Sequence, residues 1–170
     1  ARGLGDVYKG QALTEQVVDD VVQSAFGSAG QRCSACRILY VQEDVADRTI
    51  LMLQGAMQEL VVGDPDELST DVGPLIDEEA LRLVQRHKTK LSGFGRKIAE
   101  APLDKEWSRL GHFFAPVAYE IDGLDFIQEE VFGPILHVIR FKAGDIDRVI
   151  DDINATGYGL TFGIHSRIQG

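Results

Sequence analysis

The sequence is poor in the residue types that build disulfide frameworks, metal centres and membrane spans. Its 2 cysteines, Cys33 and Cys36, lie three positions apart and cannot form a disulfide framework. Its 4 histidines stand singly, without the spacing of metal ligands. No apolar run is long enough to cross a bilayer, and no stretch has the pattern of a signal peptide. We therefore expect a cytoplasmic protein with no metal ion and no membrane span.

Positive charge is also scarce. The chain has 17 Lys and Arg against 27 Asp and Glu, for a formal net charge of -10 at pH 7. Nucleic acids and anionic membranes are bound through basic patches, so we expect this chain to bind no nucleic acid and no membrane. With 170 residues and 44% hydrophobic side chains, it has the size and composition of one globular domain with a sizeable core.

Helical and strand-like apolar patterns alternate along the chain, which is typical of a layered α/β sheet. The weakest signals lie at residues 5–8 and 100–110, and the latter stretch is polar enough for a surface excursion. Pro116 places its strand at a sheet edge or makes it a strand start. The predicted elements are a helix from an N-cap at Thr14 to a stop at Gly27, strand 37–42, helix 45–62 capped by Asp44, helix 77–91, strand 113–121, strand 135–141, helix 145–154 and strand 160–165.

The strongest chemical signal is a cysteine that follows a glycine-rich break. The stretch is FGSAGQRCSACR, residues 26–37, and it comes directly after the first predicted helix. Such a break lets a substrate approach the sulfur of Cys33, which can act as a covalent nucleophile where its surroundings favour the thiolate. The alternative is that Cys33 is a small buried core residue, as free cysteines often are.

Four segments in order resemble the aldehyde dehydrogenase superfamily: GQRC (30–33), DVGPLI (71–76), EEVFGP (129–134) and YGL (158–160). Four ordered matches are far more specific than one, and the resemblance runs from about Leu13 to Ser166. The longer string SAGQRCSA is most similar to the glutamate-semialdehyde (1-pyrroline-5-carboxylate) dehydrogenase branch. Within that branch it is closest to the dehydrogenase module of bacterial proline utilization A proteins.

This resemblance implies a three-layer α/β/α catalytic (cysteine) domain over residues 13–170, with residues 1–12 as an N-terminal segment that fits the family poorly. It implies that Cys33 attacks the aldehyde carbon, and that hydride passes to NAD. L-glutamate gamma-semialdehyde would thereby become L-glutamate in proline degradation. It further implies that Glu130 bonds the hydroxyls of the nicotinamide ribose and that Phe132 packs near the nicotinamide.

Arg32 and Ser34 flank the cysteine and are candidate substrate-binding residues. The cation can attract an acidic substrate, and the hydroxyl can orient it through a hydrogen bond. The alternatives are a solvated or structurally paired arginine and a hydroxyl that satisfies loop backbone. Glu129 and Glu130 suggest an acid/base pair, but neighbours on an extended segment point to opposite faces.

The spacing of Cys33 and Cys36 is also that of a redox dithiol or half a zinc site. A strand follows the motif where a thioredoxin-like site would need a helix, and zinc would need two more ligands. We therefore expect Cys36 to be a core residue at the strand start, and no metal at this site.

We expect the chain to be a piece of a longer protein, since it starts at Ala1 without Met and ends at Gly170 after a strand-like segment. The family's Asn for the oxyanion, Glu for the hydrolytic water and Lys for the cofactor ribose match nothing here. The isolated chain should therefore have little or no activity. Complete proteins of this kind are expected to be homo-oligomers, and FAD is expected only where a proline dehydrogenase domain is present.

Three other functions stay open at this point. The chain can belong to a dehydrogenase for another aldehyde, or to a non-catalytic aldehyde-dehydrogenase-like domain used for assembly. It can also be a cysteine acyltransferase or hydrolase, which would need His112 or His137 near Cys33 as a base.

Overall fold

The computed structural model describes residues 6–8, 12–127, 129–157 and 160–166. The strands are β1 (Asp6–Tyr8), β2 (Ile38–Gln42), β3 (Arg96–Glu100), β4 (Val117–Glu120), β5 (Ile135–Phe141) and β6 (Gly163–His165). The helices are α1 (Thr14–Phe26), α2 (Glu43–Gln58), α3 (Glu78–Leu91), α4 (Trp107–Leu110) and α5 (Ile146–Ala155), with short 3-10 turns η1 (Gly27–Gly30) and η2 (Leu124–Phe126).

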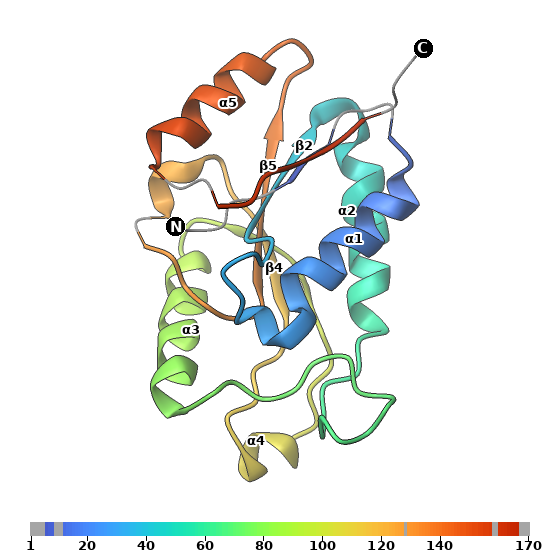
Figure 1. Cartoon of the computed structure of the whole chain (residues 1–170), viewed down its shortest axis with the longest axis vertical. Helices are drawn as coiled ribbons and strands as arrows, with labels where there is room; N and C mark the ends of the chain where they lie inside the picture. Colours follow the sequence, from blue (N-terminus) through green and yellow to red (C-terminus); the bar gives the residue numbers. More distant parts are fainter. Residues whose placement is uncertain (1–5, 9–11, 128, 158–159, 167–170) are drawn as a thin grey trace.

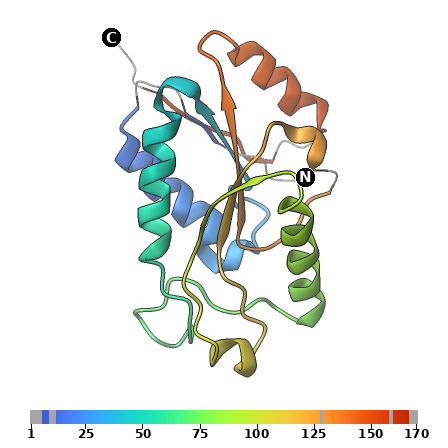
Figure 2. The same cartoon turned by 180° about the vertical axis from the view of Figure 1, so that it is seen from behind.

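The described strands form one sheet in the order β3-β4-β5-β2-β1-β6. The edge strand β3 is antiparallel to β4, and the other neighbours are parallel. Helices α1 and α2 cover one face of the sheet, and α3 and α5 cover the other (Figure 1), as the view from behind also shows (Figure 2). The predicted three-layer α/β/α fold is confirmed.

The core centres on the parallel pair of β2 and β5. The two strands pair from Ile38 opposite His137 to Gln42 opposite Phe141. β5 is buried at every position except Arg140, because helices cover both faces of the sheet. Its sequence, ILHVIRF, is accordingly a continuous apolar run with few polar interruptions rather than an alternating pattern.

Two predicted helix starts were wrong. Thr14 was expected to cap the first helix, but it is the first helical residue, and its Oγ1 lies 2.9 Å from the Tyr8 hydroxyl of β1. The threonine thus joins the helix to the sheet instead of capping it. Asp44 was expected to cap the second helix, which in fact begins at Glu43 and ends at Gln58. The Asp44 carboxylate instead accepts a hydrogen bond from Gln42 at 2.8 Å.

Two strands had no counterpart in the sequence prediction. β1 lies inside the sheet between β2 and β6, although it is only three residues long. β3 is missing from the prediction because its first two residues are charged and exposed. Its Lys97 pairs with Glu100 at 3.1 Å, and its Arg96 pairs with Glu120 of β4. Because β3 pairs with β4, β4 is an inner strand and not an edge strand. It starts directly after Pro116, which agrees with the alternative that Pro116 marks a strand start.

Two other predicted elements match closely, whereas the strands predicted over 113–121 and 160–165 are shorter, as β4 and β6. Strand 135–141 is confirmed at both ends, and the helix predicted over 77–91 is observed as α3. The Asp77 carboxylate accepts a hydrogen bond from the Ala80 backbone at 2.8 Å and caps that helix. Within the described ranges, no helix combines the length and the apolar character that a bilayer crossing requires.

The centre of β5 should dominate the stability of the fold. Leu136 is fully buried, so we expect Leu136→Ala to lower the free energy of unfolding by about 2–5 kcal/mol, through lost burial and the cavity left behind. Leu51 on α2 is 69% exposed, and Leu51→Ala should change it by less than about 0.5 kcal/mol. Urea unfolding of both variants measures the difference. Equal losses would contradict a core centred on β5.

Candidate active site

The loop that carries Cys33 leaves α1 through an unusual backbone turn. Ser28 and Ala29 both have φ of 54°, and Gly30 follows with φ of 65°. Residues other than glycine rarely adopt this left-handed region, and they persist there only where the surrounding packing fixes them. Ala29 is buried, which anchors the turn. The chain is thereby redirected so that Arg32, Cys33 and Ser34 are all exposed.

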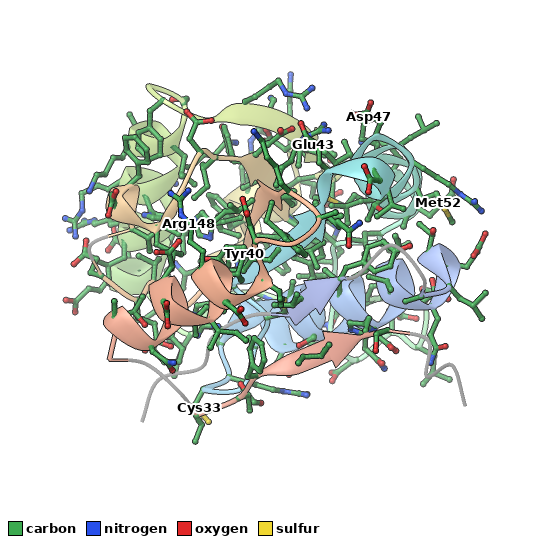
Figure 3. All side chains as sticks on the ribbon, turned by 90° about the horizontal axis from the view of Figure 1, so that it is seen from above. Cys33, Tyr40, Glu43, Asp47, Met52 and Arg148 are labelled. Carbon is green, nitrogen blue, oxygen red and sulfur yellow. The ribbon has the colours of Figure 1, made fainter. Side chains whose placement is uncertain are left out.

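The two cysteines have different environments. Cys33 is exposed, and it lies at the margin of the molecule in Figure 3, apart from Tyr40 in its middle. It is therefore not a core residue. Cys36 is buried, and its Sγ lies 3.5 Å from the carbonyl oxygen of Ile38. Cys36 is the core residue at the strand start that the sequence predicts.

The EEVFGP loop packs directly against the cysteine loop. A Cβ on Gly30 would collide with the backbone carbonyl of Gly133, and a Cβ on Gly133 would collide with Val84 of α3. Glycine at position 30 lets the two backbones come into contact, and glycine at position 133 leaves room for Val84. Residues 129–134 and the cysteine loop are thus brought together, although about a hundred residues separate them along the chain.

Gln31 joins a third motif to the same place. Its Oε1 accepts a hydrogen bond from the backbone of Ile76 at 2.8 Å, and its Nε2 donates to Pro74 at 3.4 Å and to Ser28 at 3.2 Å. Both partners beyond the loop belong to the DVGPLI segment. Of the fourth predicted motif, Tyr158 and Gly159 lie outside the described residues.

Arg37 is the residue that the sequence analysis missed. It is 6% exposed, and its Nη1 and Nη2 donate to the carbonyls of Ala35 at 3.2 Å and Arg32 at 3.0 Å. Its Nε lies 3.4 Å from Oε1 of Glu130, and its guanidinium carbon lies 4.5 Å from the ring centre of Phe132. Burial lowers the pKa of Arg37, and the Glu130 carboxylate opposes that effect. The one sequence signal was a cation at the head of an apolar strand.

The predicted site residues differ in burial: Glu130 is mostly buried against Arg37, whereas Arg32 and Ser34 are exposed. Glu130 is turned inward to Arg37, whereas Glu129 is exposed, so the two carboxylates do not act as a pair. The Nε of Arg32 donates to the Ser28 hydroxyl at 2.9 Å within its own loop, and Ser34 is exposed beside Cys33. The Nε of Arg32 therefore has a structural partner, which agrees with the alternative that Arg32 is a structurally paired arginine.

A buried histidine pair lies behind Arg37. The Nδ1 of His137 is 2.7 Å from the Arg37 carbonyl oxygen, which can only accept, so Nδ1 carries the proton. The Nε2 of neutral His137 then accepts from the Nε2 of His87 on α3 at 2.9 Å. Burial lowers the pKa of His137 to about 3 and also lowers that of His87. Both ring nitrogens of His137 are engaged, which disfavours it as a base for Cys33.

His112, the other candidate base, contributes its backbone carbonyl to a 2.9 Å hydrogen bond from Leu75. Among the residues that the structure describes, no three His, Cys, Asp or Glu side chains gather as metal ligands. The chemistry offered by this part of the chain is therefore that of a surface thiol beside a carboxylate, an aromatic ring and two arginines.

Several known proteins are similar to this chain. Residues 9–169 match the aldehyde dehydrogenase family. The chain is 48% identical over 168 residues to the bifunctional protein PutA of Klebsiella aerogenes, covering 96% of this chain and 13% of that protein. It is 34% identical over 165 residues to the 1-pyrroline-5-carboxylate dehydrogenase of Geobacillus sp. (strain WCH70), covering 96% of this chain and 31% of that enzyme.

Solved structures show the same relationship. A proline utilization A variant from Bradyrhizobium japonicum superposes with a TM-score of 0.93 at 47% identity, covering 99% of this chain and 17% of that one. The 1-pyrroline-5-carboxylate dehydrogenase from Thermus with bound NAD superposes with a TM-score of 0.86 at 29% identity, covering 98% and 32%. The chain thus spans only a small part of the length of the relatives it matches.

The buried histidine pair should make stability fall in acid. Burial lowers the pKa of His137 to about 3 from the ordinary 6.5 of an exposed histidine, so the unfolded chain takes up its proton first. Stability should therefore decrease as pH falls from 6.5 toward 3, by up to about 1.4 kcal/mol per pH unit for one proton. Urea unfolding in steps from neutral to mildly acidic pH measures this slope.

The glutamine in His137→Gln does not titrate. This variant should therefore lower that slope by up to the contribution of one proton, even if it lowers the free energy of unfolding at every pH. His112→Gln is the matched control outside the pair and should keep the slope of the unchanged chain. An identical slope in His137→Gln would show that the buried ring is not the group responsible.

Proposed function

Because the chain belongs to the aldehyde dehydrogenase family, we propose that it is the cysteine-bearing catalytic part of an NAD-dependent L-glutamate gamma-semialdehyde dehydrogenase of proline degradation. The observation that carries the proposal is the exposed Cys33 at the place where the three motif segments meet. The similarity to PutA and to 1-pyrroline-5-carboxylate dehydrogenases supports the substrate. Since the chain spans 13% of the curated PutA relative, the activity proposed is that of the complete protein.

Cys33 supplies the covalent step. Its thiolate forms a carbon–sulfur bond to the aldehyde carbon, and the carbonyl oxygen takes up negative charge. When that carbon loses hydride, the carbon–oxygen double bond returns and a thioester remains on the sulfur. Water then attacks the thioester, which releases glutamate and restores the thiol. Cys33 is exposed on the loop that follows the η1 turn, so both aldehyde and water can reach its sulfur.

Glu130 and Phe132 fit a nicotinamide cofactor in chemistry and position. A carboxylate accepts hydrogen bonds from two hydroxyls, which suits the nicotinamide ribose. Phe132 keeps 42% of its surface exposed while Arg37 lies over its ring, so an aromatic face is held at the surface beside the cysteine loop. NAD, when bound there, supplies the acceptor for the hydride. The similar 1-pyrroline-5-carboxylate dehydrogenase from Thermus, whose structure has NAD bound, supports NAD as the cofactor.

Arg32 and Ser34 suit a substrate with a carboxylate, as glutamate semialdehyde has. Arg32 is exposed next to the sulfur, and the contact of its Nε with Ser28 limits how its side chain moves. Ser34 presents a hydroxyl on the other side of Cys33. The complete protein's homo-oligomeric state, its cytoplasmic location and FAD on a separate proline dehydrogenase domain remain predictions.

The first test is NAD-linked oxidation of glutamate semialdehyde by the complete protein. Cys33→Ala should reduce kcat by at least about 1,000-fold, because no other group on this loop forms the thioester. Cys36→Ala, the matched control three residues away, should retain activity within about threefold, since its thiol is buried in the core. Undiminished turnover by Cys33→Ala would remove Cys33 as the nucleophile.

The same assay separates the alternatives. Butanal, which lacks a carboxylate, should be a poor substrate if Arg32 and Ser34 recognise the acid group. Comparable rates with butanal would favour a dehydrogenase for another aldehyde. Turnover that continues without NAD would favour an acyltransferase or hydrolase, and no turnover of any aldehyde would favour an assembly domain.

The isolated 170-residue chain should show little or no NAD-linked aldehyde oxidation. It holds the nucleophile and the ribose-binding carboxylate but no match to the residues expected to hold the oxyanion or activate water. A turnover assay of the isolated chain beside the complete protein, at equal concentration of reactive Cys33, makes the comparison. Robust oxidation by the isolated chain would overturn this expectation.

A further inference from the structure

We propose that Arg37 is a positioning residue that couples the nucleophile loop to the cofactor-binding loop, an inference that rests on the function proposed above. One guanidinium contacts both loops at once. It donates to the carbonyls of Arg32 and Ala35 on the cysteine side, and it meets Glu130 and Phe132 on the other side.

On the cysteine side, Arg37 orients the peptide unit that carries the N–H of Cys33. The carbonyl of Arg32 and the N–H of Cys33 belong to the same peptide, which is trans. The two bonds therefore point in opposite directions. Because the Arg32 carbonyl also accepts from the Ala35 backbone at 3.1 Å, two donors hold this peptide in one orientation. The direction of the N–H beside the nucleophile is thereby set.

On the cofactor side, Arg37 holds the two residues assigned to NAD. The side chains of Arg37 and Glu130 are only 8% and 11% exposed, so their attraction is little screened by water. The Phe132 ring lies 4.5 Å from the guanidinium carbon, within the range of a cation–π contact. Loss of the guanidinium would leave the Glu130 carboxylate buried without this cation, and the ring without its support.

The backbone of Arg37 is itself firmly placed. Its carbonyl oxygen accepts from the backbone N–H of His137 at 2.9 Å and from the His137 ring at 2.7 Å. The side chain therefore extends from a fixed point at the head of the central strand pair. The fixed backbone of Arg37 and its planar guanidinium together determine the relative positions of the two loops.

Lysine could not reproduce this arrangement. Its ammonium is a compact charge on a flexible stem, whereas arginine presents donors in a planar fork. Arg37→Lys can keep the attraction to Glu130 but cannot at the same time donate along two fixed directions to Arg32 and Ala35. The two functions of Arg37 should therefore separate in the lysine variant.

The test uses the complete protein, with kcat expressed per Cys33 titrated by iodoacetamide and the Kd of NAD measured by calorimetry. Arg37→Gln should lower kcat and weaken NAD binding, each by at least about 10-fold. Arg37→Lys should bind NAD within about threefold of the unchanged protein yet keep the loss in kcat. Arg140→Gln is the matched control, since Arg140 also pairs with a partly buried carboxylate, Glu120, at 2.7 Å.

A merely structural arginine gives a different result. The variants would then have fewer titratable sites or a lower Tm, with kcat per site and the Kd of NAD like those of Arg140→Gln, and the proposal would be overturned. Arg37→Lys keeps the buried charge and is the variant expected to fold. If Arg37→Gln does not fold, the result for Arg37→Lys alone decides whether Arg37 has a positioning role. A combined Arg37→Gln and Glu130→Gln variant should show non-additive effects on NAD binding, because either single change already removes the ion pair.

The outcomes also distinguish this proposal from the function on which it rests. If the unchanged protein is inactive, or if Cys33→Ala remains active, the proposed function fails. If activity depends on Cys33 and NAD while both Arg37 variants behave like Arg140→Gln, only the positioning role fails.

Discussion

A guanidinium taken out of water needs partners, and Arg37 finds carbonyl acceptors for its Nη1 and Nη2 in one loop and a carboxylate for its charge in another that is remote in sequence. Its donors satisfy carbonyls beside Cys33, and its charge faces Glu130. Neither loop has regular secondary structure over these residues, so their positions depend on contacts of this kind. The buried cation therefore links the covalent and the cofactor-binding parts of the candidate site.

The backbone contact between Gly30 and Gly133 imposes a second constraint on the same region. A side chain at Gly30 would push the Gly133 backbone away and separate the loops, and a side chain at Gly133 would collide with Val84 of α3. The left-handed Ser28 and Ala29 are the conformational cost of bringing the chain into this contact. Packing around buried Ala29 offsets that cost, and exposed Cys33 follows a few residues later.

The sheet provides the base on which both loops rest. β2 and β5 are parallel neighbours, Arg37 directly precedes β2, and His137 is the third residue of β5. The EEVFGP loop leads directly into β5, while the cysteine loop leads into β2. Two parallel strands that start side by side thus carry two loops that must meet. The buried histidine pair connects the same point to α3.

Much of the fold could be predicted from local patterns in the sequence. Strand 135–141 and helix 77–91 were predictable because the spacing of apolar side chains is a property of neighbouring residues. β1 and β3 were not, since a three-residue strand and a charged edge strand carry no clear periodicity and form only by pairing with distant partners. Thr14 misled for a similar reason, because its hydroxyl bonds to Tyr8 rather than to its own helix.

Alternating apolar patterns were enough to predict the layered α/β fold, and the ordered short segments were enough to indicate the family and the motif residues Cys33, Glu130 and Phe132. The exposure of Cys33, which the sequence left open, and the link that Arg37 makes between the two loops became clear only from the three-dimensional arrangement. Burial and long-range contacts depend on how strands pair and which backbones touch. No local stretch of sequence contains that information, so it emerges only when the whole sheet assembles.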